Sequence, residues 1–198
     1  SYEDDVKCDI FIFGNLEIIG TPKNLISIKS NDLVTPSNTD WNSIHLIYST
    51  NSNISYCKIS NFIYGIEVIN SKLNIDYSEI NNVNEMAIYS PSINSSENVI
   101  EITNCKLHDC NLGVYFRNAK SIILNHNYIY NCRNFGLRFS GNIEATYNIF
   151  FNCGTIYSHS SAVYVIDENL ELDNVVFKNN SISNCPNYSF ALYNPQDG

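Results

Sequence analysis

Apolar and polar positions recur in the same order along most of this chain. Each unit has an alternating apolar–polar run, then an Asn or Asp, then a Gly or Ala that leads into a second short apolar run. The stretch from Val99 to Phe139 contains the unit twice, as VIEITNCKLHDCNLGVYF and IILNHNYIYNCRNFGLRF. Alternation with a period of two predicts β-strands, and a unit of about 22 residues predicts a solenoid.

Six units align on one aliphatic or aromatic position, which we call the anchor. The anchors are Ile59, Ile80, Leu107, Ile129, Phe150 and Ile182. Two residues after each anchor stand Asn61, Asn82, Asp109, Asn131, Asn152 and Asn184. Asn tolerates left-handed backbone and carries both a donor and an acceptor, so this column predicts a ladder of turns.

The features of each unit follow one another in the same direction every time. Antiparallel hairpins would need reversal signals such as Asn-Gly and a register mirrored about each turn. We therefore expect each strand to pair in parallel with its copy one coil on, about 4.8 Å away. The alternative is a two-sheet antiparallel sandwich.

The repeat covers nearly the whole chain, which predicts a single domain over residues 1–198. Residues 1–43 are expected to form the first coils and a polar excursion, Asn31–Asn42, which contains Pro36 and ends after Trp41. Residues 44–198 are expected to form the regular coils. Extra residues near Ser90–Glu97, Gly154–Ser161 and Glu168–Asn174 predict insertions between strands.

Composition narrows the classes of partner. The net charge is −9, with 11 Lys and Arg against 20 Asp and Glu, so the sequence offers no basic surface for nucleic acid. No apolar run approaches the roughly 18 residues of a membrane span. The segment SYEDDVKC lacks the pattern of an export signal, which processing could have removed.

Four of the seven cysteines, Cys110, Cys132, Cys153 and Cys185, occupy one position of the repeat. A small buried residue at each coil explains this column, because a free thiol packs as a small hydrophobe. We favour reduced, stacked thiols over disulfides. Zinc is a weaker alternative, since the sequence has no C-x-x-C pair.

The pattern N-x-I-x-N-C…G-[VL]-x-F resembles the repeats of the pectate-lyase-like superfamily, including its NosD-type members. The segment GNLEIIGTPKNLISIKSND…WNSIHLI resembles the first coils of surface proteins with that fold. The resemblance implies an all-β, single-stranded, right-handed parallel β-helix of about seven coils with Asn turn ladders. It also implies an extracellular or cell-surface location. The superfamily includes lyases, hydrolases, epimerases and adhesive stalks, so it does not fix an activity.

One outward stripe suggests a carbohydrate-contacting face. The strand after each Gly or Ala projects His45, and then the candidate ligand-binding residues Glu67, Tyr89, Tyr115, Arg138, Tyr164 and Tyr193. Tyrosine rings stack on sugar rings, while Glu and Arg take hydroxyls or carboxylates. The alternative is that Tyr simply suits outward strand positions and covers its neighbours.

A second stripe carries the acidic residues Asp76, Glu101 and Glu144. In lyases of the superfamily, acidic residues on a sheet face hold Ca²⁺, so the resemblance makes these three the metal candidates under an enzymatic interpretation. Ile123 interrupts the column, and ordinary solvated strand acids are the simpler explanation.

The sequence contains no Asp cluster, nucleophile–base pair or phosphate loop, and we assign no catalytic residue. The first expectation is a non-catalytic module that binds a polysaccharide or cell-surface glycan, or that assembles. The alternatives are a uronate lyase or epimerase, and a filament subunit. The last follows from the absence of a recognisable polar cap in the sequence, which predicts end-to-end stacking of copies.

Overall fold

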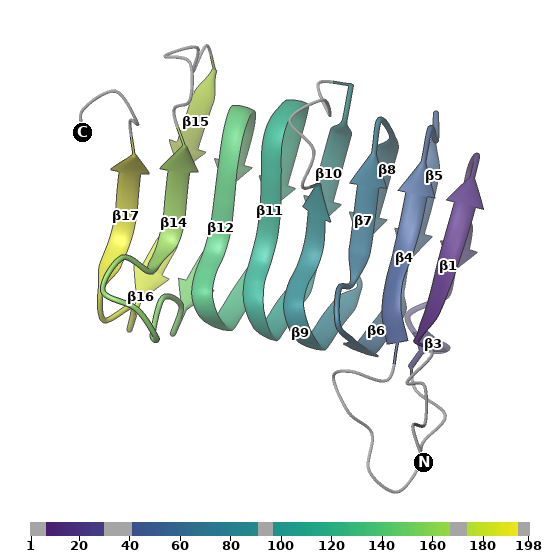
Figure 1. Cartoon of the computed structure of the whole chain (residues 1–198), viewed down its shortest axis with the longest axis horizontal. Coiled ribbons are helices and arrows are strands. Elements are labelled where there is room, and N and C mark those ends of the chain that lie inside the picture. Colours follow the sequence, from purple (N-terminus) through teal and green to yellow (C-terminus); the bar gives the residue numbers. More distant parts are fainter. Residues whose placement is uncertain (1–6, 30–40, 91–96, 167–173, 194–198) are drawn as a thin grey trace, which may run out of the picture.

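The computed structural model describes residues 7–29, 41–90, 97–166 and 174–193, and within these ranges it contains strands and no helix. The 17 strands form one continuous sheet, and every strand pair is parallel. The one antiparallel contact in this part of the chain is an isolated bridge between Thr21 and Asn24. Figure 1 shows successive coils side by side, from β1 to β17. The parallel β-helix is confirmed, and the antiparallel sandwich is excluded.

The coil has three faces. Face 1 consists of β3 (Ile26–Ile28), β6 (Cys57–Phe62), the first parts of β9 (Glu79–Ser90), β11 (Lys106–Asn125) and β12 (Tyr128–Thr146), β13 (Ile149–Phe151) and β16 (Ser181–Ser183). Face 2 consists of β1 (Cys8–Phe13), β4 (Trp41–Ile47), β7 (Ile66–Ile69), later parts of β9, β11 and β12, β14 (Ser161–Ile166) and β17 (Tyr188–Tyr193). Face 3 consists of β2 (Glu17–Ile19), β5 (Ser52–Ser55), β8 (Lys72–Asp76), β10 (Val99–Thr103), the ends of β11 and β12, and β15 (Val175–Lys178).

The predicted anchors form one internal column. Ile59 pairs with Ile80, Ile80 with Leu107, and the pairing continues through Ile129 and Phe150 to Ile182. The first five anchors are fully buried. Burying an aliphatic or aromatic side chain of this size contributes about 1.5–3 kcal/mol, so the column accounts for much of the cohesion between coils.

The turn between faces 1 and 2 is an Asn ladder, as predicted. All six residues of the column have positive φ, for example 54° at Asp109 and 53° at Asn152. Asn152 Nδ2 donates to Asn131 Oδ1 (2.9 Å), and Asn131 Nδ2 donates to Asp109 Oδ1 (3.0 Å). The amides therefore satisfy one another across coils while the backbone takes the left-handed turn.

The cysteine column lies just inside this turn. Cys110, Cys132 and Cys153 are buried, and the Sγ atoms of Cys110 and Cys132 lie 3.5 Å apart. None of the seven cysteines forms a disulfide. Contacts with the neighbouring thiols and burial raise the pKa of the Cys132 thiol, so this thiol stays protonated and packs as a small apolar group.

This arrangement predicts how the thiols react. Cys8 is exposed, Cys185 is half-buried and the other five are buried; burial raises the pKa of Cys105 to about 12. At pH 8, Ellman's reagent should react quickly with Cys8 and slowly with Cys185, and with all seven thiols only after unfolding.

Replacing Cys8 with Ser should remove the fast phase alone. Fast reaction of three or more thiols in the folded protein would contradict the buried column.

The polar excursion Asn31–Asn42 falls almost entirely outside the described residues. Only its last two residues are described, and they begin β4. The ring of Trp41 lies 5.7 Å from that of Phe62 in the next coil. In the ranges that the structure describes, no helix is long and apolar enough to cross a membrane.

Candidate functional site on face 1

Face 1 carries an outward column on each side of the anchors. The column before the anchors runs Lys58, Glu79, Lys106, Tyr128 and Ile149. The column after them runs Ser60, Asn81, His108, Tyr130 and Phe151. Alternate strand residues point outward, so the two columns place charged and aromatic side chains together on the surface.

His108 lies at the centre of a chain of charged groups. Its Nδ1 is 2.7 Å from Asp109 Oδ2, and its Nε2 is 3.5 Å from Glu79 Oε1. Glu79 Oε1 in turn accepts a hydrogen bond from Lys58 Nζ (2.6 Å). The imidazole is 10% exposed, and a carboxylate faces each ring nitrogen. This network fixes the orientation of the ring.

The network sets which groups carry charge at neutral pH. Burial opposes ionisation of Glu79, but the hydrogen bond and charge of Lys58, with a smaller contribution from His108, lower its pKa. Burial likewise opposes ionisation of Asp109, and hydrogen bonds from His108 and Asn131 outweigh it and lower its pKa. Burial, with the charges of Asp109 and Glu79, raises the pKa of Tyr130. The carboxylates therefore accept hydrogen bonds, and the tyrosine hydroxyl remains a donor.

Two tyrosines extend the site into an aromatic shelf, which we define as His108, Tyr128 and Tyr130. The ring of Tyr130 stacks on His108, with centroids 4.3 Å apart and planes 11° apart. Tyr128 stacks on Tyr130, also at 4.3 Å. Tyr128 is 36% exposed, so the shelf presents aromatic surface to solvent.

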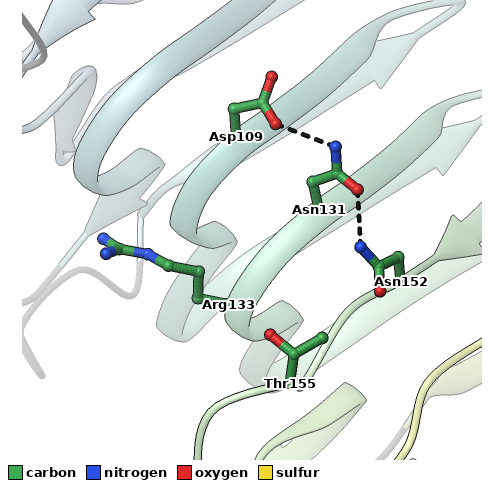
Figure 2. A pocket seen from close by; sticks show the side chains of 5 residues that line it. All are labelled: Asp109, Asn131, Arg133, Asn152 and Thr155. Carbon is green, nitrogen blue, oxygen red and sulfur yellow. Dashed lines mark hydrogen bonds between the residues drawn. The ribbon is translucent and has the colours of Figure 1, made fainter.

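A hollow of about 360 Å³ opens at the turn next to the shelf (Figure 2). Asp109, Asn131 and Asn152 stand in a row along one side, and Arg133 and Thr155 line the rest. Arg133 is oriented by a hydrogen bond from Nη2 to the carbonyl of Asn84 (2.8 Å). Every lining residue is polar, and together they offer both donors and acceptors.

The predicted stripe on face 2 exists as a column, but it is not an open surface. Glu67, Tyr89, Tyr115, Arg138 and Tyr164 pair in register. Tyr89 and Tyr115 are only 7% and 8% exposed, because they pack in an outer cluster with Leu112, Phe135 and Ile166. Both rings are thus unavailable for stacking against a ligand.

The charged residues of the stripe, Arg138 and Glu67, also contact other side chains of the protein. The guanidinium of Arg138 lies 5.1 Å from the ring centroid of Tyr115 and 5.5 Å from that of Tyr164. Glu67 contacts Nδ1 of His45, whose Nε2 lies 2.9 Å from Asp9 Oδ1. These contacts indicate a role for most of the stripe in holding coils together, through cation–π and charged interactions. Glycan contact by its outer members stays a prediction.

The placement of Tyr193 in this column is wrong. The structure pairs Tyr164 with Ala191, and Tyr193 with Ile166, two residues further along. The alignment had matched Ala191 to the small residue of the other coils. The structure instead pairs Tyr188 with Ser161, and Ser161 with Phe135. Tyr188 therefore follows Cys185 by three residues, just as Phe135 follows Cys132. The ring of Tyr193 nevertheless lies 6.3 Å from that of Tyr164.

The three acidic candidates for Ca²⁺ lie on face 3 and do not converge. Glu101 pairs with Ile123, which pairs with Glu144, so an aliphatic side chain separates the two acids. Asp76 belongs to another column, pairs with Thr103 and accepts its hydroxyl hydrogen bond (2.8 Å). Among the described residues, no group of three or more His, Cys, Asp or Glu is placed to hold a metal ion.

The sequence analysis did not single out His108 and missed the network around it. The repeat did contain a signal for this network, in the residues that flank each anchor. Writing out the residues directly before and after each anchor would have placed Lys58, Glu79 and Lys106 in one column, and His108 beside Tyr130 in the other. Asp109 was predicted only as a rung of the turn ladder.

The fold and this surface define a class of protein: a parallel β-helical solenoid with Asn-lined turns and a polar, aromatic outer face. The chain matches the family described as right handed beta helix region over residues 42–197, and it belongs to that family. The match confirms the right-handed coil that the family resemblance implied.

The comparison with curated proteins gives no match. Among solved structures, the chain is similar to an alginate lyase from Paenibacillus sp. str. FPU-7. The identity is 14%, the alignment covers 93% of this chain and 88% of that chain, and the TM-score is 0.33. A likeness of this degree carries no conclusion about activity or ligand.

Proposed function

We propose that this β-helix is a glycan-binding module at the cell surface or outside the cell, and that face 1 is its contact surface. One observation carries the proposal: a hollow lined only by polar side chains is joined, through the contact of Asp109 with His108, to a stack of rings that ends in the exposed Tyr128. Sugars have apolar ring faces and hydroxyl-rich edges, so a site for them needs aromatic surface and hydrogen-bonding groups together.

The aromatic shelf and the polar hollow of face 1 contact different parts of a sugar. The rings of Tyr128 and Tyr130 take the apolar face of a sugar. Asp109 accepts hydrogen bonds from hydroxyls, and Arg133 donates to their oxygens. Because the ladder and the charged network already fix these side chains, binding costs little ordering of the protein.

Charge favours a neutral glycan. Three cations (Lys58, Lys106 and Arg133) and two anions (Glu79 and Asp109) lie on or beside this face, so it is nearly balanced. The whole chain has a net charge of −9, which repels a polyanion at long range. A neutral polysaccharide is therefore the better ligand than a polyuronate.

Replacing Tyr130 with Ala should weaken glycan binding. An aromatic stacking contact contributes about 0.5–1.5 kcal/mol, so the dissociation constant should rise by up to about tenfold. The measurement is calorimetric titration with soluble neutral oligosaccharides, after a screen against insoluble polysaccharides.

Tyr48→Ala is the matched control, because Tyr48 is 68% exposed and lies at the turn between faces 2 and 3. Equal losses in both variants, or no binding to any neutral glycan, would reject face 1 as the contact surface.

A polysaccharide-active enzyme is the second candidate, and the His108–Asp109 pair supports it. A histidine oriented by a carboxylate at 2.7 Å, next to a hollow, has the arrangement of a general base. Product formation from polysaccharides, with and without Ca²⁺, tests this candidate. Turnover that His108→Gln abolishes while glycan binding persists would establish it over a purely adhesive role.

A further inference from the structure

The corner between faces 3 and 1 carries a column of residues that all adopt the left-handed backbone. Their φ angles lie between 46° and 56°. Each backbone N–H of the first five donates to a carbonyl of the next coil, as in Tyr77 N to Thr103 O (3.2 Å) and His126 N to Thr146 O (3.1 Å). We call this the corner column: Tyr56, Tyr77, Asn104, His126, Tyr147 and Asn179.

The rings of the corner column stack in two pairs. Tyr56 and Tyr77 have centroids 5.1 Å apart and planes 3° apart. His126 and Tyr147 have centroids 4.9 Å apart and planes 11° apart. Asn104 stands between the pairs, is exposed, and carries no ring. The aromatic stack therefore has a gap one coil wide.

The gap has the thickness of one ring. Two coil steps of about 4.8 Å separate Tyr77 from His126, or about 9.6 Å in all. A ring inserted between two others needs about 3.5–4.0 Å on each side. A flat ring leaves some of this space unfilled, whereas a puckered pyranose with hydrogens on both faces is thicker and fills more of it.

Glu79 and Lys106 place charged groups on the face 1 side of the gap. A hollow of about 300 Å³ runs along the corner from the earlier coils and reaches the gap at Asn104. Its lining also includes Pro22, Leu25, Tyr56, Tyr77, Glu79 and Lys106, and His126 is not part of it. A hydrogen bond from Asn104 Nδ2 to Asp76 Oδ1 (3.0 Å) fixes the orientation of the amide. A ligand here meets ring faces above and below, and charged or amide groups at one edge.

We propose that the gap at Asn104 is a subsite for a single pyranose ring of a glycan. The ring lies between Tyr77 and His126, and its hydroxyls bond to Asn104, Glu79 and Lys106. The inference rests on the proposed function only for the class of ligand. The corner column shares no residue with the aromatic shelf or with the polar hollow of Figure 2.

The decisive variant is Asn104→Tyr, which fills the gap from within. The column already accommodates Tyr at φ 46° and 56°, so the backbone accepts the substitution. The matched control is Asn179→Tyr, which makes the same change at φ 56° but adds its ring beyond Tyr147, outside the gap. Circular dichroism melts establish that both variants fold.

The probes are soluble cellohexaose, xylohexaose and mannohexaose, with indole as a flat aromatic comparison. For the hexasaccharide that binds, Asn104→Tyr and Tyr77→Leu should each lower affinity about tenfold or more, while Asn179→Tyr keeps the affinity of the unmodified protein. The ring proton resonances of His126 should shift on titration. Unchanged affinity in Asn104→Tyr, or binding of indole alone at the gap, would overturn the subsite.

The outcomes separate the two proposals. Affinity lost in Tyr130→Ala but kept in Asn104→Tyr rejects the subsite and leaves the face 1 proposal standing. The reverse pattern rejects the face 1 shelf and supports the subsite. If none of the three hexasaccharides binds, the subsite is rejected, and the polysaccharide screen decides the face 1 proposal by itself.

Discussion

Asn148→Ala should destabilise the folded protein by roughly 2–4 kcal/mol. Asn148 is fully buried inside the corner between faces 3 and 1. Its Oδ1 accepts from the backbone N–H of Asn127 (2.9 Å), and its Nδ2 donates to the carbonyl of Leu124 (2.9 Å). Alanine leaves the N–H of Asn127 buried without a partner, which costs about 1–3 kcal/mol. It also removes a hydrogen bond worth about 1 kcal/mol from the Leu124 carbonyl, which keeps its place in the ladder between β11 and β12. Chemical denaturation followed by circular dichroism measures the change.

Asn142→Ala is the control for this substitution. The Nδ2 of Asn142 also donates to a backbone carbonyl, that of Lys120 (3.2 Å), but at an exposed turn. Water replaces the lost bond there, so the cost should stay near or below about 1 kcal/mol. An Asn148→Ala variant no less stable than Asn142→Ala would show that the inner hydrogen bonds are dispensable.

The same inner column explains two cysteines that the sequence alone did not. Cys57 and Cys105 occupy the position of Asn148 in earlier coils, and their Sγ atoms lie 3.5 Å and 3.6 Å from the carbonyls of Ile18 and Ile75. Thiol and amide side chains therefore serve one purpose at this position, because each donates to a carbonyl of the preceding coil; the hydroxyl of Ser78 donates instead to Asp76 in its own coil.

The columns were predictable because the coil repeats its own register. A slip of one residue would turn every anchor outward, so the apolar pattern specifies the pairing strongly. The prediction was wrong where it relied on a single residue type. Ala191 resembled the small residue of the other coils, but the length of the turn after Cys185 decided the register.

The exposed fraction of an outward side chain was less predictable from the sequence than the side of the strand on which it lies. Alternation correctly assigned Tyr89 and Tyr115 to the outer side of their strands. It could not show that Leu112 and Phe135, which pair where the register of β11 and β12 shifts, pack against those rings. A register shift interrupts the strand period, so the side-chain contacts there depend on the three-dimensional path of the chain.

The face 1 site was hidden for a related reason. Lys58, Glu79 and His108 are separated along the chain by whole coils, and no local motif joins them. Their contacts arise only because the same strand position recurs one coil later. In a solenoid, the neighbours of a residue are its copies in adjacent repeats, and a search for sites has to follow columns rather than segments.

The second large effect is expected at the anchor Phe150. Its ring is fully buried, whereas the next residue, Phe151, is 37% exposed on the outer side of the same strand. Phe150→Ala should cost about 3–5 kcal/mol, because the surrounding coils cannot close the cavity that a lost ring leaves. The backbone pairing of β13 with β12 and β16 keeps the coils at a fixed distance, so they cannot move inward to fill the cavity.

Phe151→Ala makes the same change one residue away and should cost about 1 kcal/mol or less, since no cavity forms and only part of the ring is removed from contact. Denaturation of the two variants side by side measures the difference directly. A strand that slipped by one residue would exchange the two positions. Similar losses of stability in both variants would therefore mean that Phe150 does not face the interior, which would contradict the internal column of anchors.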